Sequence, residues 1–145
     1  MKALIQRVSQ ASVTIEGVEK GAIHQGLVVF LGIEKNDTPA IAQKLLDRLI
    51  HYRIFSDQEG KMNLSLRDIR GGLLIISQFT LAAETRKGLR PSFSSAAPPE
   101  PAKNLYTFFV EQAQQQLDQV AQGEFAADMQ VQLINDGPVT FLLEA

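Results

Sequence analysis

Two hydroxyl side chains and one carboxamide follow an apolar run in the middle of the chain. The run is residues 73–76, and the polar residues are Ser77, Gln78 and Thr80, with Phe79 between them. Polar side chains directly after an apolar strand lie at the rim of a sheet, where sites are common. Ser77 or Thr80 could therefore act as a nucleophile, although both hydroxyls could instead bond to neighbouring backbone.

A second candidate lies near the C-terminus, at residues 135–140, which read Asn-Asp-Gly-Pro-Val-Thr. Gly137 lets the backbone adopt angles that are closed to other residues, and Pro138 has no N–H and cannot continue a strand ladder. About 5–6% of X-Pro bonds in folded proteins are cis, so the sequence leaves the isomer open. The pattern predicts a rigid tip with outward carbonyl oxygens, and an ordinary turn without chemistry is the alternative.

The chain has few residues that could support thiolate or metal chemistry. It has no cysteine, which excludes disulfides and thiolate catalysis, and only two histidines, His24 and His51. Two histidines are too few for a multi-histidine metal site, and no metal-ligand spacing is present. We therefore predict no metal and no cofactor.

Length and composition are those of one folded domain. The chain has 145 residues, of which 45% are hydrophobic and 21% charged, so we expect residues 1–145 to form a single domain. It has no signal-like segment and no apolar run long enough for a membrane span, which favours a cytoplasmic protein without a membrane partner. A net charge of −2 argues against coating nucleic acid through the overall field. Arg86, Lys87 and Arg90 form a local basic cluster, which could contact phosphates or could be an ordinary solvated loop.

The remaining sequence predicts the elements that must position these candidates. Thr38 followed by Pro39 is typical of a helix start, and apolar residues follow at helical spacing up to residue 50. A second amphipathic helix is expected over 102–121, after a long irregular segment at 84–101. Strands are expected from β-branched runs and alternation at 2–9, 11–16, 22–24, 26–33 (buried on both faces, at the centre of a sheet), 62–66, 73–76, 129–133 and 139–143. Two helices and several strands favour an α+β fold with a mainly antiparallel sheet or an open β-barrel.

The two candidate motifs together resemble the signature motifs of the D-aminoacyl-tRNA deacylases, editing enzymes of bacteria and eukaryotes. The first motif is residues 77–81 and the second is residues 135–140. Residues 1–8 with Arg7, and the segments 55–63, 90–93 and 125–129, also resemble this family, so the similarity covers essentially the whole chain in the family's order.

This resemblance implies a homodimer with its site at the subunit interface. The tip at Gly137 and Pro138, with a cis bond, would enter the other subunit's pocket beside residues 77–80, and Arg7 would brace the tip through its backbone. Two carbonyl oxygens of the tip would accept hydrogen bonds from the substrate's α-ammonium group. The same backbone would exclude the side chain of an L-residue, so D-aminoacyl-tRNA, and also glycyl-tRNA, would be cleaved.

The resemblance also implies that the tRNA assists the reaction. Family members are thought to use the 2′-OH of the terminal adenosine to activate or orient water, while backbone N–H groups near Gln78 and Phe79 stabilise the oxyanion. Phe79 and Met129 would line the adenine pocket. The basic cluster at 86–90 would meet the acceptor stem, and no DNA partner is expected. The alternatives are an esterase or peptidase with Thr80 or Ser77 as nucleophile, and a non-catalytic tRNA-binding dimer.

Overall fold

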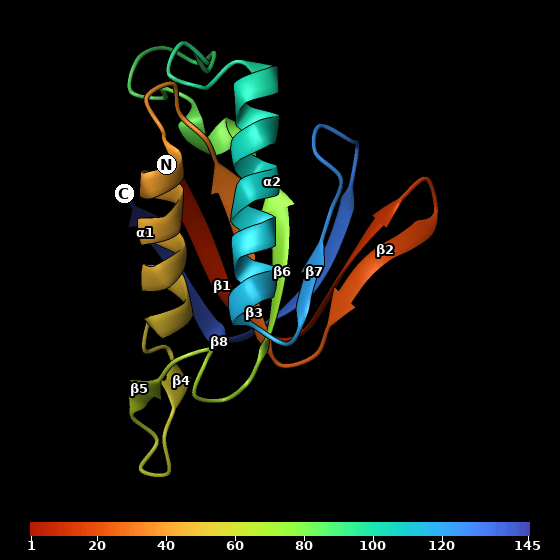
Figure 1. Ribbon diagram of the computed structural model, residues 1–145, viewed down its shortest axis with the longest axis vertical. Helices are drawn as coiled ribbons and strands as arrows, with labels where there is room; N and C mark the ends of the chain where they lie inside the picture. Colours follow the sequence, from red (N-terminus) through yellow and green to blue (C-terminus); the bar gives the residue numbers. More distant parts are fainter.

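The computed structural model describes residues 1–145 and contains one mixed sheet, one small hairpin and two long helices (Figure 1). The strands are β1 (Lys2–Ile15), β2 (Val18–Ile23), β3 (Gly26–Gly32), β4 (Phe55–Ser56), β5 (Met62–Leu64), β6 (Gly72–Ser77), β7 (Val120–Gln122) and β8 (Gln130–Glu144). The helices are α1 (Pro39–His51), the short 3₁₀ helix η1 (Phe79–Ala82) and α2 (Pro99–Gln116).

The main sheet has the strand order β2-β1-β3-β6-β7, with β8 also paired to β1. All pairs that involve β1 are antiparallel, whereas β3, β6 and β7 run parallel to one another. The edge strands β2 and β7 contact each other, so the sheet curls until it nearly closes as a barrel (Figure 1). The predicted α+β fold is confirmed, and so is the central place of the apolar strand β3.

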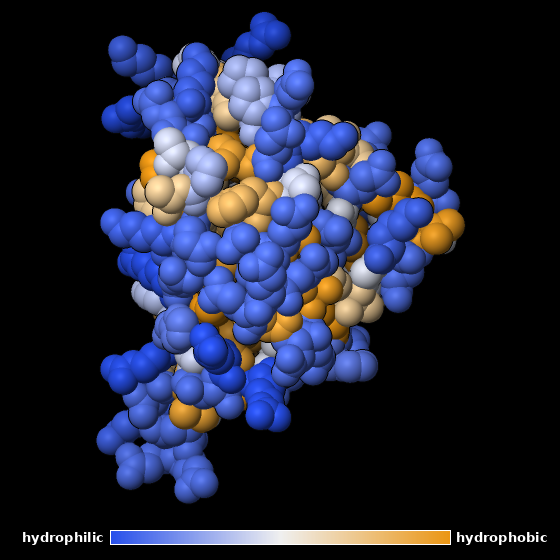
Figure 2. All heavy atoms as spheres, viewed as in Figure 1, coloured by the Kyte–Doolittle hydropathy of each residue, from blue (hydrophilic) through white to orange (hydrophobic).

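Helices α1 and α2 lie side by side on one face of the sheet (Figure 1). A cluster of 24 buried residues fills the space between these helices and the sheet, and a second cluster of seven lies inside the curled half. The outward face of the helices is hydrophilic in Figure 2, and apolar atoms show mainly between elements. None of the helices combines the length and the apolar character that crossing a membrane requires.

Helix α1 begins as its sequence predicts. Thr38 has an extended backbone, and its Oγ1 accepts a hydrogen bond from the N–H of Ile41 at 3.3 Å, while Pro39 occupies the first turn. Ala42, Leu45, Leu46, Leu49 and Ile50 form its buried face. His51 lies exposed at the end of α1.

The boundaries of helix α2 differ from the prediction. It begins at Pro99, inside the segment expected to be irregular, because prolines are tolerated in the first turn of a helix. It ends at Gln116, and Val120, which was expected in the helix, pairs with Leu73 of β6 in strand β7. The apolar spacing of the helix continues into β7 by coincidence, and pairing with the sheet decides the conformation.

Strands β1 and β8 are each longer than predicted. Residues 2–9 and 11–16 were expected as separate strands, but β1 is continuous from Lys2 to Ile15. The strands expected at 129–133 and 139–143 fall, except for Met129, in the single strand β8, which pairs with β1 on each side of the Gly-Pro segment. Strands β1 and β8 pair with each other along most of their length, so both continue through the positions where the local sequence pattern predicts a break.

Candidate functional site

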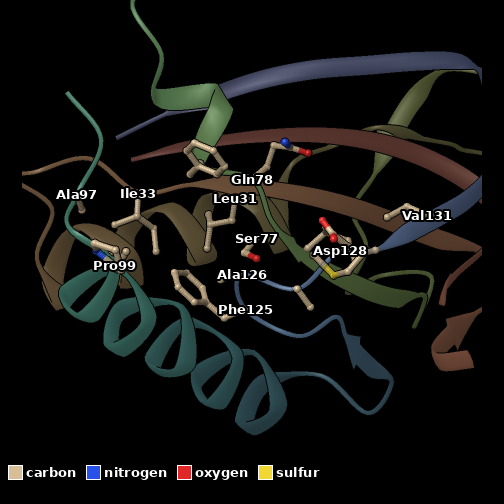
Figure 3. Close-up of a pocket in the computed structure, with 15 residues that line it drawn as sticks. Leu31, Ile33, Ser77, Gln78, Ala97, Pro99, Phe125, Ala126, Asp128 and Val131 are labelled. Carbon is tan, nitrogen blue, oxygen red and sulfur yellow. The ribbon is translucent and has the colours of Figure 1, made fainter. Parts of the chain in front are cut away.

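A mostly apolar pocket of about 500 Å³ opens at the C-terminal end of β6 (Figure 3). This volume suits a nucleoside or an aminoacyl group. The pocket is lined by residues from β3 and β6, the start of α2 and the segment before β8: Leu31, Ile33, Ile76, Ser77, Gln78, Phe79, Ala97, Pro99, Ala102, Phe125, Ala126, Ala127, Asp128, Met129 and Val131. The pocket thus brings together four of the predicted site residues, Ser77, Gln78, Phe79 and Met129.

The polar residues after β6 are held by close packing against β3. Ser77 is the last residue of β6, and Phe79 begins the short helix η1. A Cβ atom at Gly32 would lie 2.8 Å from the Cβ of Leu81, so only glycine lets η1 approach the end of β3 this closely. The site therefore depends on a residue that contributes no side chain to it.

The backbone N–H groups of this segment are not equally available. The N–H of Gln78 donates to the carbonyl oxygen of Leu31 at 2.8 Å, so it cannot also donate to a ligand. The expectation of an oxyanion donor at Gln78 is therefore wrong. The N–H groups of Phe79 and Thr80 have no acceptor within the chain, because they open a helix and face no strand.

The hydroxyl of Thr80 has no base beside it. Its Oγ1 accepts a hydrogen bond from Nε2 of Gln78 at 2.6 Å, and Thr80 itself is exposed and does not line the pocket. Neither histidine is near: His51 Nδ1 lies 2.8 Å from the carbonyl oxygen of Asp47 on α1, and His24 lines a separate polar hollow. An activated hydroxyl needs such a base, so the geometry does not favour Thr80 as a nucleophile.

The segment between β7 and β8 supplies further wall residues, to which the sequence analysis assigned no role beyond family resemblance. Phe125 and Asp128 line the pocket together with Met129, and Figure 3 shows Ser77 flanked by the Phe125 ring and the Asp128 carboxylate. Ala126 has a φ of 63°, in the left-handed region, which bends this segment around the pocket. The signal in the sequence was the resemblance of the segment 125–129 to the deacylase family, which did not say that Phe125 and Asp128 would line the pocket.

The Gly137-Pro138 tip is a bulge within strand β8, and its peptide bond is cis. The partner of Gln6 is Thr140 and the partner of Val8 is Asn135, so the four residues 136–139 stand opposite a single residue of β1. The prediction that the chain leaves regular pairing here is confirmed. None of residues 135–140 lines the pocket, so one chain does not bring the two candidates together.

Side chains on both sides of the bulge hold it in place. Oδ1 of Asn135 accepts from the N–H of Val139 at 2.8 Å, and its Nδ2 donates to Oγ1 of Thr140 at 2.9 Å. The same Oγ1 accepts from Nε2 of Gln6 at 3.0 Å. The carboxamide of Asn135 thus supplies bonds that the interrupted ladder does not make.

Arg7 stands opposite the bulge and bonds to its backbone. Its Nε donates to the carbonyl oxygen of Asp136 at 3.0 Å, and its Nη1 donates to that of Ile54 at 2.7 Å. Only 13% of the Arg7 side chain is exposed. Oδ2 of Asp136 also lies 3.8 Å from its Nε. A buried cation needs acceptors, and here both are backbone carbonyls.

The basic cluster divides into one paired and two unpaired cations. Arg86 bonds to the Glu84 carboxylate through both Nε, at 2.9 Å, and Nη2. Hydrogen bonds from Arg86 hold the pKa of Glu84 down at about 2, so the pair is charged at neutral pH. Lys87 and Arg90 are exposed and have no carboxylate partner.

Comparison with known proteins decides the family. A sequence model of the family described as D-Tyr-tRNA(Tyr) deacylase matches residues 4–144. The chain belongs to this family. Its relatives include proteins named D-aminoacyl-tRNA deacylase from Stutzerimonas stutzeri (strain A1501), 59% identical over 145 residues and 100% of both chains, and from Proteus mirabilis (strain HI4320), 59% identical over 144 residues and 99% of both chains.

Two solved structures share the architecture of this deacylase family member. One is named c-Myc DNA Unwinding Element Binding Protein and has a TM-score of 0.95, with 40% identity over 100% of this chain and 99% of the other. The other is named a probable eukaryotic D-amino acid tRNA deacylase and has a TM-score of 0.86, with 17% identity over 99% of this chain and 98% of the other. The second similarity shows the fold alone.

Proposed function

We propose that this protein is an ester hydrolase that removes D-amino acids from tRNA. The observation that carries the proposal is the pocket at the end of β6, which Ser77 and Phe79 line, with the open N–H groups of Phe79 and Thr80 at the start of the adjoining helix η1, in a chain whose close relatives are named D-aminoacyl-tRNA deacylase. The terminal adenosine of the tRNA occupies the apolar part of the pocket, between Phe79 and Met129. The ester carbonyl then lies at the rim.

Hydrolysis in this site needs no protein nucleophile. Water attacks the ester carbonyl carbon, and the N–H groups of Phe79 and Thr80 donate to the oxyanion that forms; losing one such donor costs about 10²–10³ in rate. The bond from this carbon to the ribose 3′ oxygen then breaks, and a proton from the water passes to that oxygen. The neighbouring 2′-OH of the tRNA orients the water, which fits the lack of a base beside Thr80.

A second subunit completes the site. The tip at Gly137 and Pro138 enters the partner's pocket, where its carbonyl oxygens accept from the substrate ammonium and its backbone excludes L side chains. Leu142, 52% exposed, is a cross-strand neighbour of Leu4, which in turn faces Phe30, so the sheet presents apolar side chains for a second copy beside the tip. Arg7 keeps the tip in position through the two carbonyl bonds described above.

The tRNA body is held mainly through its phosphates. Lys87 and Arg90 are free to contact the acceptor stem, whereas Arg86 is already neutralised by Glu84. Affinity should therefore fall as salt rises. We place the single-domain protein in the cytoplasm with its substrate and expect no DNA partner, so a DNA duplex of equal length serves as the competitor in binding assays.

The chirality of hydrolysis tests the proposal. Purified protein is incubated with D-tyrosyl-, L-tyrosyl- and glycyl-tRNA, and the remaining ester is measured over time. We expect cleavage of the D-tyrosyl and glycyl esters and protection of the L-tyrosyl ester, because glycine has no side chain to collide with the tip. Full protection of glycyl-tRNA would refute exclusion as the selector, and equal cleavage of both tyrosyl esters would refute chiral selection.

Replacing Thr80 separates RNA-assisted cleavage from a protein nucleophile. In Thr80→Ala we expect a modest loss of rate, and a strong loss when wild type meets tRNA whose terminal ribose lacks the 2′-OH. Almost complete loss in Thr80→Ala would instead support an esterase or peptidase mechanism through Thr80, with Ser77→Ala as the matching test of the other hydroxyl. Retention of tRNA without turnover would support a non-catalytic binding dimer.

A further inference from the structure

Two exposed phenylalanine rings lie against each other beside the pocket. The ring centroids of Phe79 and Phe93 are 5.0 Å apart with an interplanar angle of 48°, and 61% of Phe79 and 40% of Phe93 is exposed. Single exposed apolar side chains are common, but two adjoining aromatic rings that each keep so much exposed area are a feature of ligand-binding surfaces. We call this pair the aromatic platform.

The aromatic platform is continuous with the pocket and is fixed in place. Phe79 lines the pocket and its ring also packs against the ring of Phe93, so the apolar surface continues from the pocket to the exterior. The loop that carries Phe93 is closed by reciprocal backbone bonds between Glu84 and Ser92, of 2.8 and 3.2 Å. Oγ of Ser95 also bonds to the carbonyl oxygen of Ala82, which ties the loop to helix η1.

The charges around the platform suit a polyanion. Lys87 and Arg90 belong to the loop that carries Phe93, and neither has a carboxylate partner. Glu84, the carboxylate of this loop, is occupied by Arg86. Aromatic faces for bases beside free cations for phosphates are the combination that binds single-stranded nucleic acid.

We propose that the aromatic platform is a stacking subsite for the nucleotide that directly precedes the terminal adenosine of the tRNA. This inference rests on the proposed function, because it takes the terminal adenosine to occupy the pocket that Phe79 lines. The preceding base then leaves the pocket at the surface formed by Phe79 and Phe93. Stacking there is tolerant of base identity, so the subsite adds affinity for the 3′ end without selecting among tRNA species.

The test measures binding and does not depend on turnover. The ligands are an uncharged acceptor-stem hairpin RNA with the 3′ cytidine-cytidine-adenosine end, and the same RNA with an abasic nucleotide before the terminal adenosine. We expect wild type to bind the abasic RNA roughly 5- to 160-fold more weakly, the range of one base-aromatic stack. Phe93→Ala should lose a similar factor on the intact RNA and should then no longer distinguish the two RNAs.

Variants of the same loop show whether the aromatic face is what matters. Phe93→Leu keeps apolar bulk without a ring and should bind as weakly as Phe93→Ala, whereas Phe93→Trp should restore discrimination between the two RNAs. Leu89→Ala is the matched control, because Leu89 lies in the same loop and is fully exposed; it should bind like wild type.

Three results would overturn the subsite. The first is equal binding of both RNAs by wild type, and the second is a Phe93→Ala variant that still loses the full factor on the abasic RNA. The third is conversion of a wild-type dimer to monomer by Phe93→Ala in sedimentation, which would show that the platform is covered by a second copy. A protein that passes the binding test but cleaves no aminoacyl ester would refute the proposed function alone.

Discussion

Arg7 joins two segments that lie far apart in the chain. Its guanidinium bonds to the carbonyl of Asp136 in the bulge and to that of Ile54 after helix α1, so the bulge is positioned from outside its own strand. A lysine could not make both bonds, because its ammonium is a single point on a flexible stem whereas the guanidinium offers several fixed donors. Arg7 thus adds two bonds from outside the strand to those that Asn135 and Gln6 make at the ends of the bulge.

Gly137 is the residue whose replacement most directly tests the bulge. It has a φ of +137°, and a Cβ there would lie 2.6 Å from Cγ2 of Val139 and 3.1 Å from Nη2 of Arg7. In Gly137→Ala we expect kcat/KM for D-tyrosyl- and glycyl-tRNA to fall about 10²-fold, the cost of a misplaced positioning group. Single-turnover deacylation measures this directly.

The control is Gly60→Ala in the turn between β4 and β5. Gly60 also has a positive φ, of +76°, but its Cβ would meet nothing within 4 Å. This variant should cost roughly 1–2 kcal/mol of stability from backbone strain and leave the rate unchanged. Equal activity of the two variants would contradict a special role for the bulge.

Residue-scale features differ in how far they could be predicted from the sequence. The family resemblance predicted that Arg7 bonds to the tip, but the second acceptor, on Ile54, lies 47 residues away and only the fold reveals it. The N–H of Gln78 shows the opposite case. A local motif suggested a free donor, and a strand 47 residues earlier, at Leu31, occupies it.

At the scale of elements, the loop over 84–95 carries both the side chains proposed to bind RNA and the hydrogen bonds that fix its conformation. Backbone hydrogen bonds within the loop hold Phe93 against Phe79 of helix η1. The ion pair between Glu84 and Arg86 neutralises one of the three cations of the loop. The sequence predicted three cations available for tRNA, and the structure leaves two. A carboxylate two residues before Arg86 was visible in the sequence, but which cation it would pair with depended on the turn.

Removing the Glu84 carboxylate should release Arg86 for RNA. In Glu84→Gln we expect tighter binding of the acceptor-stem hairpin at low salt, and a slope of log affinity against log salt that is steeper by about 1. Because Arg86 holds the pKa of Glu84 at about 2, below the ordinary 4.5, the pair persists above that range and breaks only as pH falls through about 2. The gain in Glu84→Gln should therefore stay constant across neutral pH.

Glu59→Gln supplies the matched control for this charge change. The Glu59 carboxylate lies 3.2 Å from Nζ of Lys61 on the β4–β5 hairpin, and both side chains are exposed. Glu59→Gln changes the net charge of the protein by the same amount as Glu84→Gln, at a residue that does not line the pocket. An equal gain in both variants would show an effect of overall charge and would contradict a specific release of Arg86.

Tyr106 connects helix α2 to the strand that ends at the site. Its hydroxyl donates to the carbonyl oxygen of Ile75 at 2.9 Å, and this oxygen also accepts the N–H of Gly123 at 3.0 Å. Tyr106→Phe therefore leaves the carbonyl bonded once and should cost only about 0.5–1.5 kcal/mol in urea unfolding. Tyr52→Phe, at a tyrosine with no hydroxyl bond within the chain, is the control.

Burial also predicts how this difference changes with pH. It raises the pKa of Tyr106 above its ordinary 10, so the folded protein keeps the phenol protonated where the unfolded chain ionises. Stability from this group is complete below pH 10 and is lost as pH rises beyond it. Wild type should thus lose stability more steeply in alkaline solution than Tyr106→Phe, and parallel curves would contradict this cause.

Element boundaries show why sequence patterns predict some features and miss others. Helix α1 could be predicted at its start because Thr38 and Pro39 fix the first turn locally. The end of helix α2 could not, since the apolar spacing of the helix runs on into β7 and the partner strand β6 lies almost 50 residues earlier. Local signals are decisive only where no distant pairing competes.

At the scale of the whole molecule, the sheet face that points away from the helices is only partly covered: the second cluster of buried residues fills its curled half, and the rest stays open. Helices α1 and α2 cover the opposite face (Figure 1), and the cross-strand neighbours Leu4, Phe30 and Leu142 face away from them. The sequence predicted both the fold class and a site shared between subunits. The fold class is confirmed, and the shared site stays a prediction that this apolar face supports.

A charge on this face should separate the subunits. In Leu142→Glu we expect a monomer in sedimentation equilibrium and loss of D-tyrosyl-tRNA hydrolysis, because burying an unpaired carboxylate in an apolar interface is costly. Val18→Glu is the control, since Val18 is 56% exposed but lies at the far hairpin. A Leu142→Glu protein that is monomeric and fully active would contradict a site completed by the partner.

The bulge in β8 has a consequence for how this scaffold can change over evolutionary time. Pairing with β1 resumes on each side of residues 136–139, so each flank keeps its own register whatever the length of the insert. Mutations, insertions or deletions in those four positions can thus reshape the proposed stereochemical filter while the inherited barrel stays as it is. New substrate preferences are accessible to this protein through one small exchangeable segment, without refolding the rest.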